Sequence, residues 1–152
     1  MRLRLACSMA AYLLATPAHA ALGESVKSVD ADRQALKASV RVLADARFGA
    51  ARYSAHEIQT PEGTLIREYV DLGGTVFAVT WQGSFMPNLR QTLGRYFETY
   101  QSVVRGVRKG RSGVSVVTPM LIVHSGGRLR AFSGIAYLPP AVPANVAIGE
   151  LR

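Results

Sequence analysis

The sequence predicts an α+β fold: an antiparallel sheet of about five strands, a meander plus a hairpin, packed against one main helix and an N-terminal helix. Apolar runs typical of strands are separated by turn residues, and two other segments repeat apolar residues at helical spacing. The expected order is α-β-β-β-α-β-β, and no linker in it is long enough to separate two domains. We therefore expect one domain over residues 21–152, a usual size for a single core.

The first twenty residues have the pattern of a cleavable export signal. Arg2 and Arg4 precede the apolar stretch Leu5–Ala15, and Ala18-His19-Ala20 supplies the small residues that a signal peptidase requires. The apolar stretch is shorter than the roughly 20 residues that cross a bilayer. The sequence thus predicts cleavage after Ala20, a periplasmic or secreted protein, and no transmembrane segment in what remains.

Composition narrows the classes of function. Cys7, in the signal, is the only cysteine, so disulfides, thiolate metal ligands and a cysteine nucleophile are excluded after cleavage. The chain has a formal net charge of +8, which favours anionic surfaces such as phospholipid headgroups or acidic glycans. Nucleic acid is not an expected partner of an exported protein.

The first element after the signal is predicted to be a helix over 29–46. Ser28 provides an N-cap, Val29, Leu36, Val40 and Leu43 share one helical face, and Gly49 ends the segment.

Three strand-like runs follow at 51–59, 64–71 and 75–82, separated by Pro61-Glu62-Gly63 and Gly73-Gly74. They predict an antiparallel meander. In the third run Phe77, Val79 and Trp81 alternate with smaller residues, which places them together on the core face and predicts a buried Trp81.

The main helix is predicted over 88–105, with Asn88 as N-cap. Its aromatic and aliphatic stripe is typical of a core face, and we expect Leu93, Phe97 and Tyr100 to dock on the strand face that carries Phe77, Val79 and Trp81. Gly94 lies off this stripe and marks either a close contact or mere tolerance of glycine.

Two further runs, 114–125 and 128–137, flank Gly126-Gly127, a dipeptide that indicates a tight hairpin turn. Pro119 interrupts the first run, so we expect it at an edge or a bulge. The proline-rich tail, about 139–152, is expected to run over the surface.

Five segments carry a resemblance to a known family: His56–Pro61, Arg67–Val70, Val76–Gly83, Met86–Gln91 and Ser125–Phe132. In them the chain resembles the proteobacterial family catalogued as domain of unknown function 2844. The resemblance implies an exported protein of Gram-negative bacteria, and it supplies no catalytic residues.

The residues themselves give little support for catalysis. His56-Glu57 begins like the zinc motif His-Glu-x-x-His, but position 60 is Thr and the segment is strand-like, where adjacent side chains point to opposite faces. His124 precedes Ser125-Gly126-Gly127 without the nucleophile elbow of a hydrolase. His56, Glu57 and His124 therefore form a candidate polar site at most. The sequence predicts no metal and no cofactor.

The densest charge lies in Arg105, Arg108, Lys109 and Arg111, between the main helix and the last strands. These residues form either an anion-binding loop, since arginine binds phosphates bidentately, or a solvated connection whose first cations favour the helix C-terminus.

Three hypotheses of function remain. The leading one is a non-catalytic envelope module that binds an anionic envelope component or a partner protein. The second is a small envelope hydrolase using His56 or His124 with nearby carboxylates, for which those side chains must converge in one concave pocket. The third is a structural secreted subunit, which requires an exposed apolar sheet edge.

Overall fold

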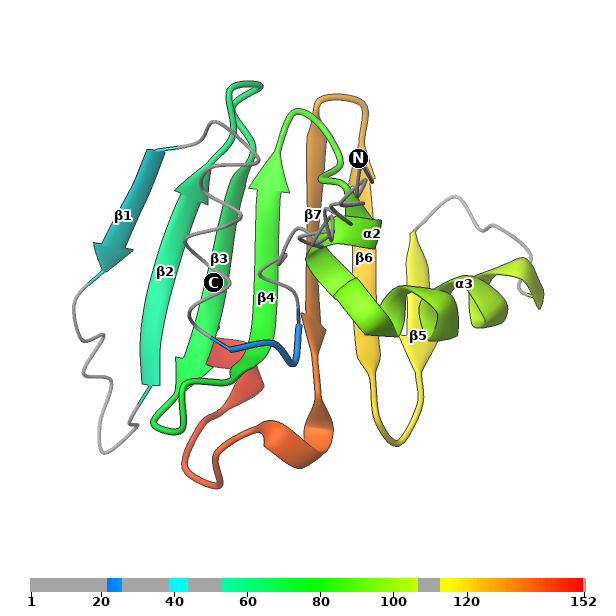
Figure 1. Ribbon diagram of the computed structural model, residues 1–152. Helices are drawn as coiled ribbons and strands as arrows, with labels where there is room; N and C mark the ends of the chain where they lie inside the picture. The colour runs from blue at the N-terminus through cyan, green and yellow to red at the C-terminus, as the bar shows by residue number, and fades with distance from the viewer. Residues whose placement is uncertain (1–21, 26–38, 44–52, 107–112, 152) are drawn as a thin grey trace, which may run out of the picture.

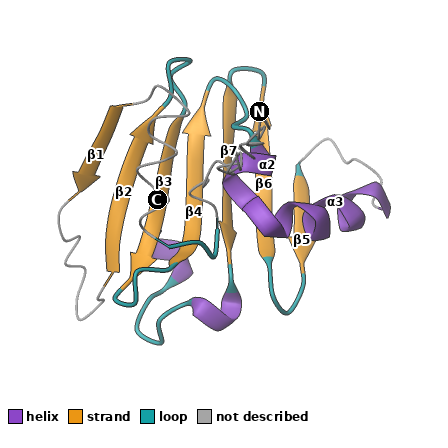
Figure 2. Cartoon of the chain, viewed as in Figure 1, coloured by secondary structure: helices purple, strands orange, loops and turns teal. Residues whose placement is uncertain are grey.

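The computed structural model describes residues 22–25, 39–43, 53–106 and 113–151, with only the backbone described for 39–43. It contains one antiparallel sheet of seven strands in the order β1-β2-β3-β4-β7-β6-β5 (Figure 1), with helical segments and loops distributed around it as Figure 2 shows. The strands are β1 (Ser39–Leu43), β2 (Tyr53–Gln59), β3 (Leu65–Asp71), β4 (Val76–Gly83), β5 (Val114–Val117), β6 (Ile122–Arg128) and β7 (Ala131–Tyr137). The helical segments are α2 (Leu89–Leu93), η1 (Gly94–Tyr96), α3 (Phe97–Gly106), η2 (Pro139–Ala141) and η3 (Ile148–Glu150).

The α+β class and the antiparallel sheet are confirmed, but the helix expected over 29–46 is wrong at Ser39–Leu43. This stretch is the edge strand β1, whose Ser39 pairs with Gln59 of β2. The rest of the predicted helix lies outside the described residues. In Ser39–Leu43, Val40 and Val42 alternate with Arg41 as in a strand, whereas Val40 and Leu43 are spaced as on one face of a helix, and pairing with β2 selects the strand.

The meander of β2, β3 and β4 is confirmed, with one irregularity that changes the face of Phe77. Tyr69 pairs with Ala78 while Val70 pairs with Val76, so Phe77 is an extra residue in β4. Such a bulge interrupts the two-residue alternation. Phe77 consequently joins the cluster on the opposite face from Val79 and Trp81, and the prediction that all three share a face is wrong.

The run predicted as one strand over 114–125 is two strands, and this split together with β1 raises the count from about five to seven. Pro119 lies in the turn between β5 and β6, not at a bulge within a strand. Gly126-Gly127 is not the hairpin turn but part of β6, where a Cβ on Gly127 would lie 2.4 Å from the Ala131 carbonyl oxygen. Leu129-Arg130 forms the turn instead, with Arg130 at φ 64.

The main helix begins as predicted but is broken at Gly94. The Asn88 side chain accepts hydrogen bonds from the backbone N–H groups of Arg90 and Gln91, which caps α2. Gly94 then adopts φ 50, a conformation that favours glycine, and the chain passes through η1 into α3. Gly94 therefore marks a break in the helix.

Helices α2 and α3 lie over one face of the sheet (Figure 1) and close the main core. Leu93 is fully buried against the cluster that contains Val79 and Trp81, as predicted, while Phe97 and Tyr100 are only partly buried there. Trp81 is 2% exposed, which confirms the expected burial. No helix in the described part of the chain is long and apolar enough to cross a membrane.

The tail packs on the other face of the sheet, over the part nearest the end of β7. Leu151 is buried there in a cluster with Tyr53, Tyr69 and Phe77, and Tyr53 meets the Phe77 ring edge-on at 5.9 Å between centroids. Burial, with Tyr69 and then Glu150 nearby, raises the pKa of the Tyr53 hydroxyl. The tail therefore covers part of this face and leaves another part open.

Candidate functional site

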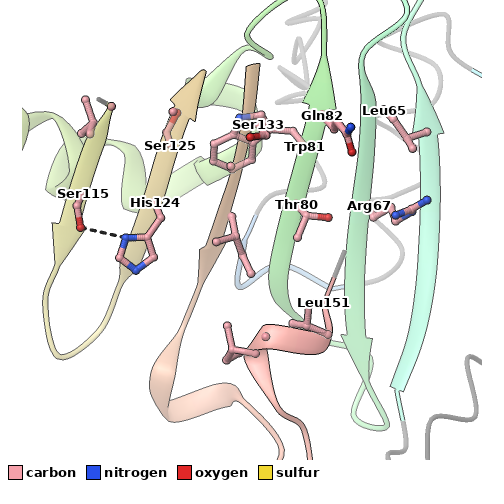
Figure 3. A pocket seen from close by; sticks show the side chains of 17 residues that line it. Leu65, Arg67, Thr80, Trp81, Gln82, Ser115, His124, Ser125, Ser133 and Leu151 are labelled. Atoms are coloured by element: carbon pink, nitrogen blue, oxygen red, sulfur yellow. Dashed lines mark hydrogen bonds between the residues drawn. The ribbon is translucent and has the colours of Figure 1, made fainter. Parts of the chain in front are cut away.

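The open part of the face opposite the helices forms a groove with a volume of about 760 Å³, which we call the open-face groove (Figure 3). Strands β3, β4, β7, β6 and β5 form its floor, and η3 with the end of the tail bounds one side. Its lining consists of Leu65, Arg67, Thr80, Trp81, Gln82, Gly113, Val114, Ser115, His124, Ser125, Gly126, Ser133, Gly134, Ile135, Ile148, Gly149 and Leu151.

Strand register explains why polar residues from distant parts of the sequence meet in this groove. One row of directly paired residues crosses the sheet in the order Arg67, Thr80, Ile135, His124, Ser115. Directly paired residues point to the same face, and neighbouring strands lie about 4.8 Å apart. The row therefore presents side chains over a span of roughly 19 Å.

A second row, one pleat further along the strands, runs in the order Leu65, Gln82, Ser133, Gly126. Gly126 has no side chain and Ser133 has a short one, so little side-chain volume fills this part of the groove. Gln82 and Ser133 are both exposed. The two rows together give the groove hydroxyl, amide, imidazole and guanidinium groups beside apolar residues and glycines.

Two of these polar groups are held by neighbours on the same face. Ser115 Oγ lies 3.0 Å from His124 Nδ1, a hydrogen bond across β5 and β6. Arg67 donates from Nε to Glu57 Oε2 at 2.8 Å, across β2 and β3. Each contact joins two directly paired residues on adjacent strands. The pairing of the strands therefore holds the imidazole and the guanidinium in position.

The structure separates the three residues of the predicted polar site. His56 pairs with Glu68, which pairs with Val79 of the main core, so His56 faces the helices; it lies 3.2 Å from Ser54 Oγ. Glu57 and His124 both face the groove side, but three strands lie between β2 and β6. That separation is roughly 19 Å, so Glu57 and His124 do not form one site.

Glu57 contacts Arg67 beside the groove, and two other carboxylates lie elsewhere. Glu62 and the buried Glu68 line a second cavity of about 320 Å³ between the β2–β3 turn and the start of α2. No carboxylate lines the open-face groove within the described residues. Nor do three or more His, Asp or Glu side chains gather as metal ligands in that part of the chain.

Of the predicted anion-binding residues, the structure describes Arg105. It lies near the end of α3, and its Nη2 donates to Gln101 Oε1 at 2.7 Å. Arg108, Lys109 and Arg111 lie outside the described residues.

Sequence reasoning missed most of the groove. Thr80, Gln82, Ser115 and Ser133 are ordinary strand residues when taken singly, and none has a motif around it. The available signal was alternation: each of them lies between residues that face the helices, so a polar second face was implied. What alternation does not give is the β4–β7 pairing that brings the two halves of the chain together.

Comparison with known proteins gives a family without an assigned activity. A family model described as "Protein of unknown function (DUF2844)" matches residues 18–151, which confirms the resemblance found in the sequence. Searches of curated proteins and of solved structures give no match.

Proposed function

Since the chain belongs to the family Protein of unknown function (DUF2844), we propose its function from its own residues: an exported, non-catalytic binding module of the bacterial envelope, with the open-face groove as its binding site. The proposed ligand is an anionic envelope component, and the proposed location is the periplasm or the exterior.

Export is supported by the N-terminal pattern, and the packing that follows it is compatible with cleavage after Ala20. Leu22 is fully buried in the main core, two residues beyond the predicted cleavage point at Ala20. Its backbone N–H donates to the Thr92 carbonyl oxygen at 3.1 Å. A domain that starts immediately after Ala20 keeps this core residue, whereas cleavage a few residues later removes it.

The observation that carries the binding role is the chemistry of the groove. An elongated open surface lined by hydrogen-bonding groups, with one arginine and one histidine and no carboxylate among its described lining, suits an extended ligand rich in oxygen atoms. Acidic glycans and phosphorylated saccharides of the envelope have this chemistry. Arg67 is fixed by Glu57 and still lies in the lining, so it provides a positioned donor.

Capture from envelope extract tests the proposal. The full sequence carrying a C-terminal tag is expressed for export, and the material that it retains is analysed for saccharide, lipid and protein. The groove variant Gln82→Ala/His124→Ala removes two exposed hydrogen-bonding side chains. The control Thr99→Ala/Ser102→Ala removes two exposed hydroxyls on α3, away from the groove.

We expect one saccharide-containing component that the groove variant retains at least about tenfold less well, since each lost hydrogen bond weakens binding by about 1 kcal/mol. The α3 control should retain it fully. Equal retention by all three proteins, or no retained component, would contradict the proposed groove.

The hydrolase remains a second candidate because of one contact, the Ser115–His124 hydrogen bond in the groove. A serine hydroxyl beside an imidazole is the minimal arrangement for nucleophilic catalysis. The two candidates differ in a simple assay: ester or amide hydrolysis that Ser115→Ala abolishes would favour the enzyme, whereas binding without turnover favours the module.

A further inference from the structure

One end of the sheet combines exposed apolar side chains with arginines. Leu129, at the tip of the β6–β7 hairpin, is 88% exposed and lies between Arg128 and Arg130, which are exposed as well. Phe85 and Met86, in the loop from β4 to α2, are 58% and 40% exposed. Both loops emerge at the upper end of the sheet in Figure 1.

The two loops are neighbours in space. Gly83, the last residue of β4, pairs with Phe132, and Phe132 pairs with Gly127 near the end of β6. The Ser125 hydroxyl contacts Met86 Sδ at 3.8 Å, which holds the β4–α2 loop against β6. We call the surface formed by Phe85, Met86, Arg128, Leu129 and Arg130 the tip surface.

The arginines of the tip surface differ from the other arginines whose side chains the structure describes. Those others each contact a polar side chain: Arg67 with Glu57, Arg90 with Glu98, Arg95 with Glu24 and Arg105 with Gln101. The side chains of Arg128 and Arg130 have no ion pair or hydrogen bond within the described part of the chain. Their charges are therefore available to an external anion.

The opposite end of the sheet has exposed apolar residues without this charge. Leu72 in the β3–β4 turn is 75% exposed, and Met120 in the β5–β6 turn is 54% exposed. Neither turn contains a charged residue, and the residue before Leu72 is Asp71, an acid at the end of β3. At the tip end an acid, Glu62, lies in the β2–β3 turn, whereas both arginines lie beside Leu129 itself. Apolar exposure and positive charge coincide at the tip surface.

We propose that the tip surface docks the protein on an anionic phospholipid bilayer. Leu129 and Phe85 enter the boundary between headgroups and acyl chains, and Arg128 and Arg130 bind lipid phosphates on either side. This docking surface is separate from the open-face groove and does not depend on it.

Vesicle co-sedimentation tests this proposal with the protein expressed from its full sequence for export. Vesicles of phosphatidylcholine alone are compared with vesicles of phosphatidylcholine and phosphatidylglycerol. We expect binding only to the mixture, decreasing as salt rises. Arg128→Gln/Arg130→Gln should weaken it about 30-fold, or about 5-fold for each arginine. Leu129→Ser should weaken it roughly tenfold.

Leu72→Ser is the matched control, because it makes the same change at a similarly exposed turn on the opposite end. It should bind like the unchanged protein. All these variants alter exposed side chains in turns or at the end of β6, and equal thermal unfolding temperatures would establish that each is folded.

The proposal is overturned if the unchanged protein ignores the acidic vesicles, or if Leu72→Ser weakens binding as much as Leu129→Ser. It is also overturned if neutralising Arg108, Lys109 and Arg111 abolishes binding while Arg128→Gln/Arg130→Gln does not. Concentration-dependent self-association lost in Leu129→Ser would show that a second copy covers the tip. None of these outcomes bears on the open-face groove, whose variants are tested separately.

Discussion

Replacing Gly134 with alanine is expected to destabilise the protein, because this glycine leaves the space that the Trp81 ring occupies. A Cβ atom at position 134 would lie 2.2 Å from Trp81 Cζ2 and 2.7 Å from the His124 carbonyl oxygen. Carbon atoms in contact normally lie about 3.5 to 4.0 Å apart. Because β7 pairs with β4 on one side and β6 on the other, it has little freedom to move away. We expect a loss of about 3 kcal/mol, the upper end of the usual cost of overpacking.

A double-mutant cycle with Trp81→Leu isolates the cause. Leucine lacks the ring atoms nearest to position 134, so Gly134→Ala should cost only about 1 kcal/mol in that background, with the His124 carbonyl as the remaining obstacle. The coupling between the two substitutions is then about 2 kcal/mol.

Urea unfolding followed by circular dichroism measures all four proteins of the cycle. Trp81 is the only tryptophan in the chain, so its fluorescence in Gly134→Ala also reports displacement of the ring from the core as a shift to longer wavelength. Additive costs in the cycle, with an unshifted emission spectrum, would refute the reasoning that the ring and the glycine share one space.

Three further predictions concern the two cores and the N-terminus. Burial raises the pKa of the Tyr53 hydroxyl above its ordinary 10.0, so the stability contributed by the protonated hydroxyl is complete below pH 10.0 and is lost at higher pH. In Tyr53→Phe, the free energy of unfolding should therefore decrease less steeply with pH in the alkaline range. Phe97→Ala should cost about 2 kcal/mol in chemical unfolding, less than a fully buried ring, because Phe97 is partly buried and contacts the Arg90 guanidinium at 4.5 Å. Mass spectrometry of the exported protein should find cleavage after Ala20, and Leu22→Ala should lower stability by about 3 kcal/mol since Leu22 is fully buried.

The sequence pattern over a few residues was sufficient to predict the features that depend on interactions between neighbouring residues. The Asn88 cap, the buried Trp81 and the meander of β2 to β4 follow from side-chain hydrogen bonding and from alternation over a few residues. Ser39–Leu43 is different, because Val40 and Val42 have strand spacing while Val40 and Leu43 have helical spacing, and only a neighbouring strand decides between them. Gly126-Gly127 misled for a related reason: glycine indicates both a turn and a close approach of two backbones.

The groove depended on long-range pairing that no local pattern encodes. β4 and β7 are separated by the helices and by two strands in sequence, yet they are neighbours in the sheet. That pairing puts Thr80 on one side of Ile135, and His124 pairs with Ile135 on the other side. Without the strand register, the sequence shows only that His124 precedes two glycines. It does not show that Glu57 lies several strands away from His124.

The residues that stabilise the fold differ from the exposed residues proposed to bind a ligand or a membrane, and this difference makes both proposals testable. The helix face is closed by buried apolar residues, and the tail covers the aromatic cluster around Tyr53 and Phe77 on the other face. Exposed residues of the groove and of the tip surface, such as Gln82 and Leu129, belong to neither cluster. Substituting them removes little buried area, so the free energy of unfolding should change by no more than about 0.5 kcal/mol each. A loss of binding in these variants therefore reports contact with a ligand or a membrane and not partial unfolding.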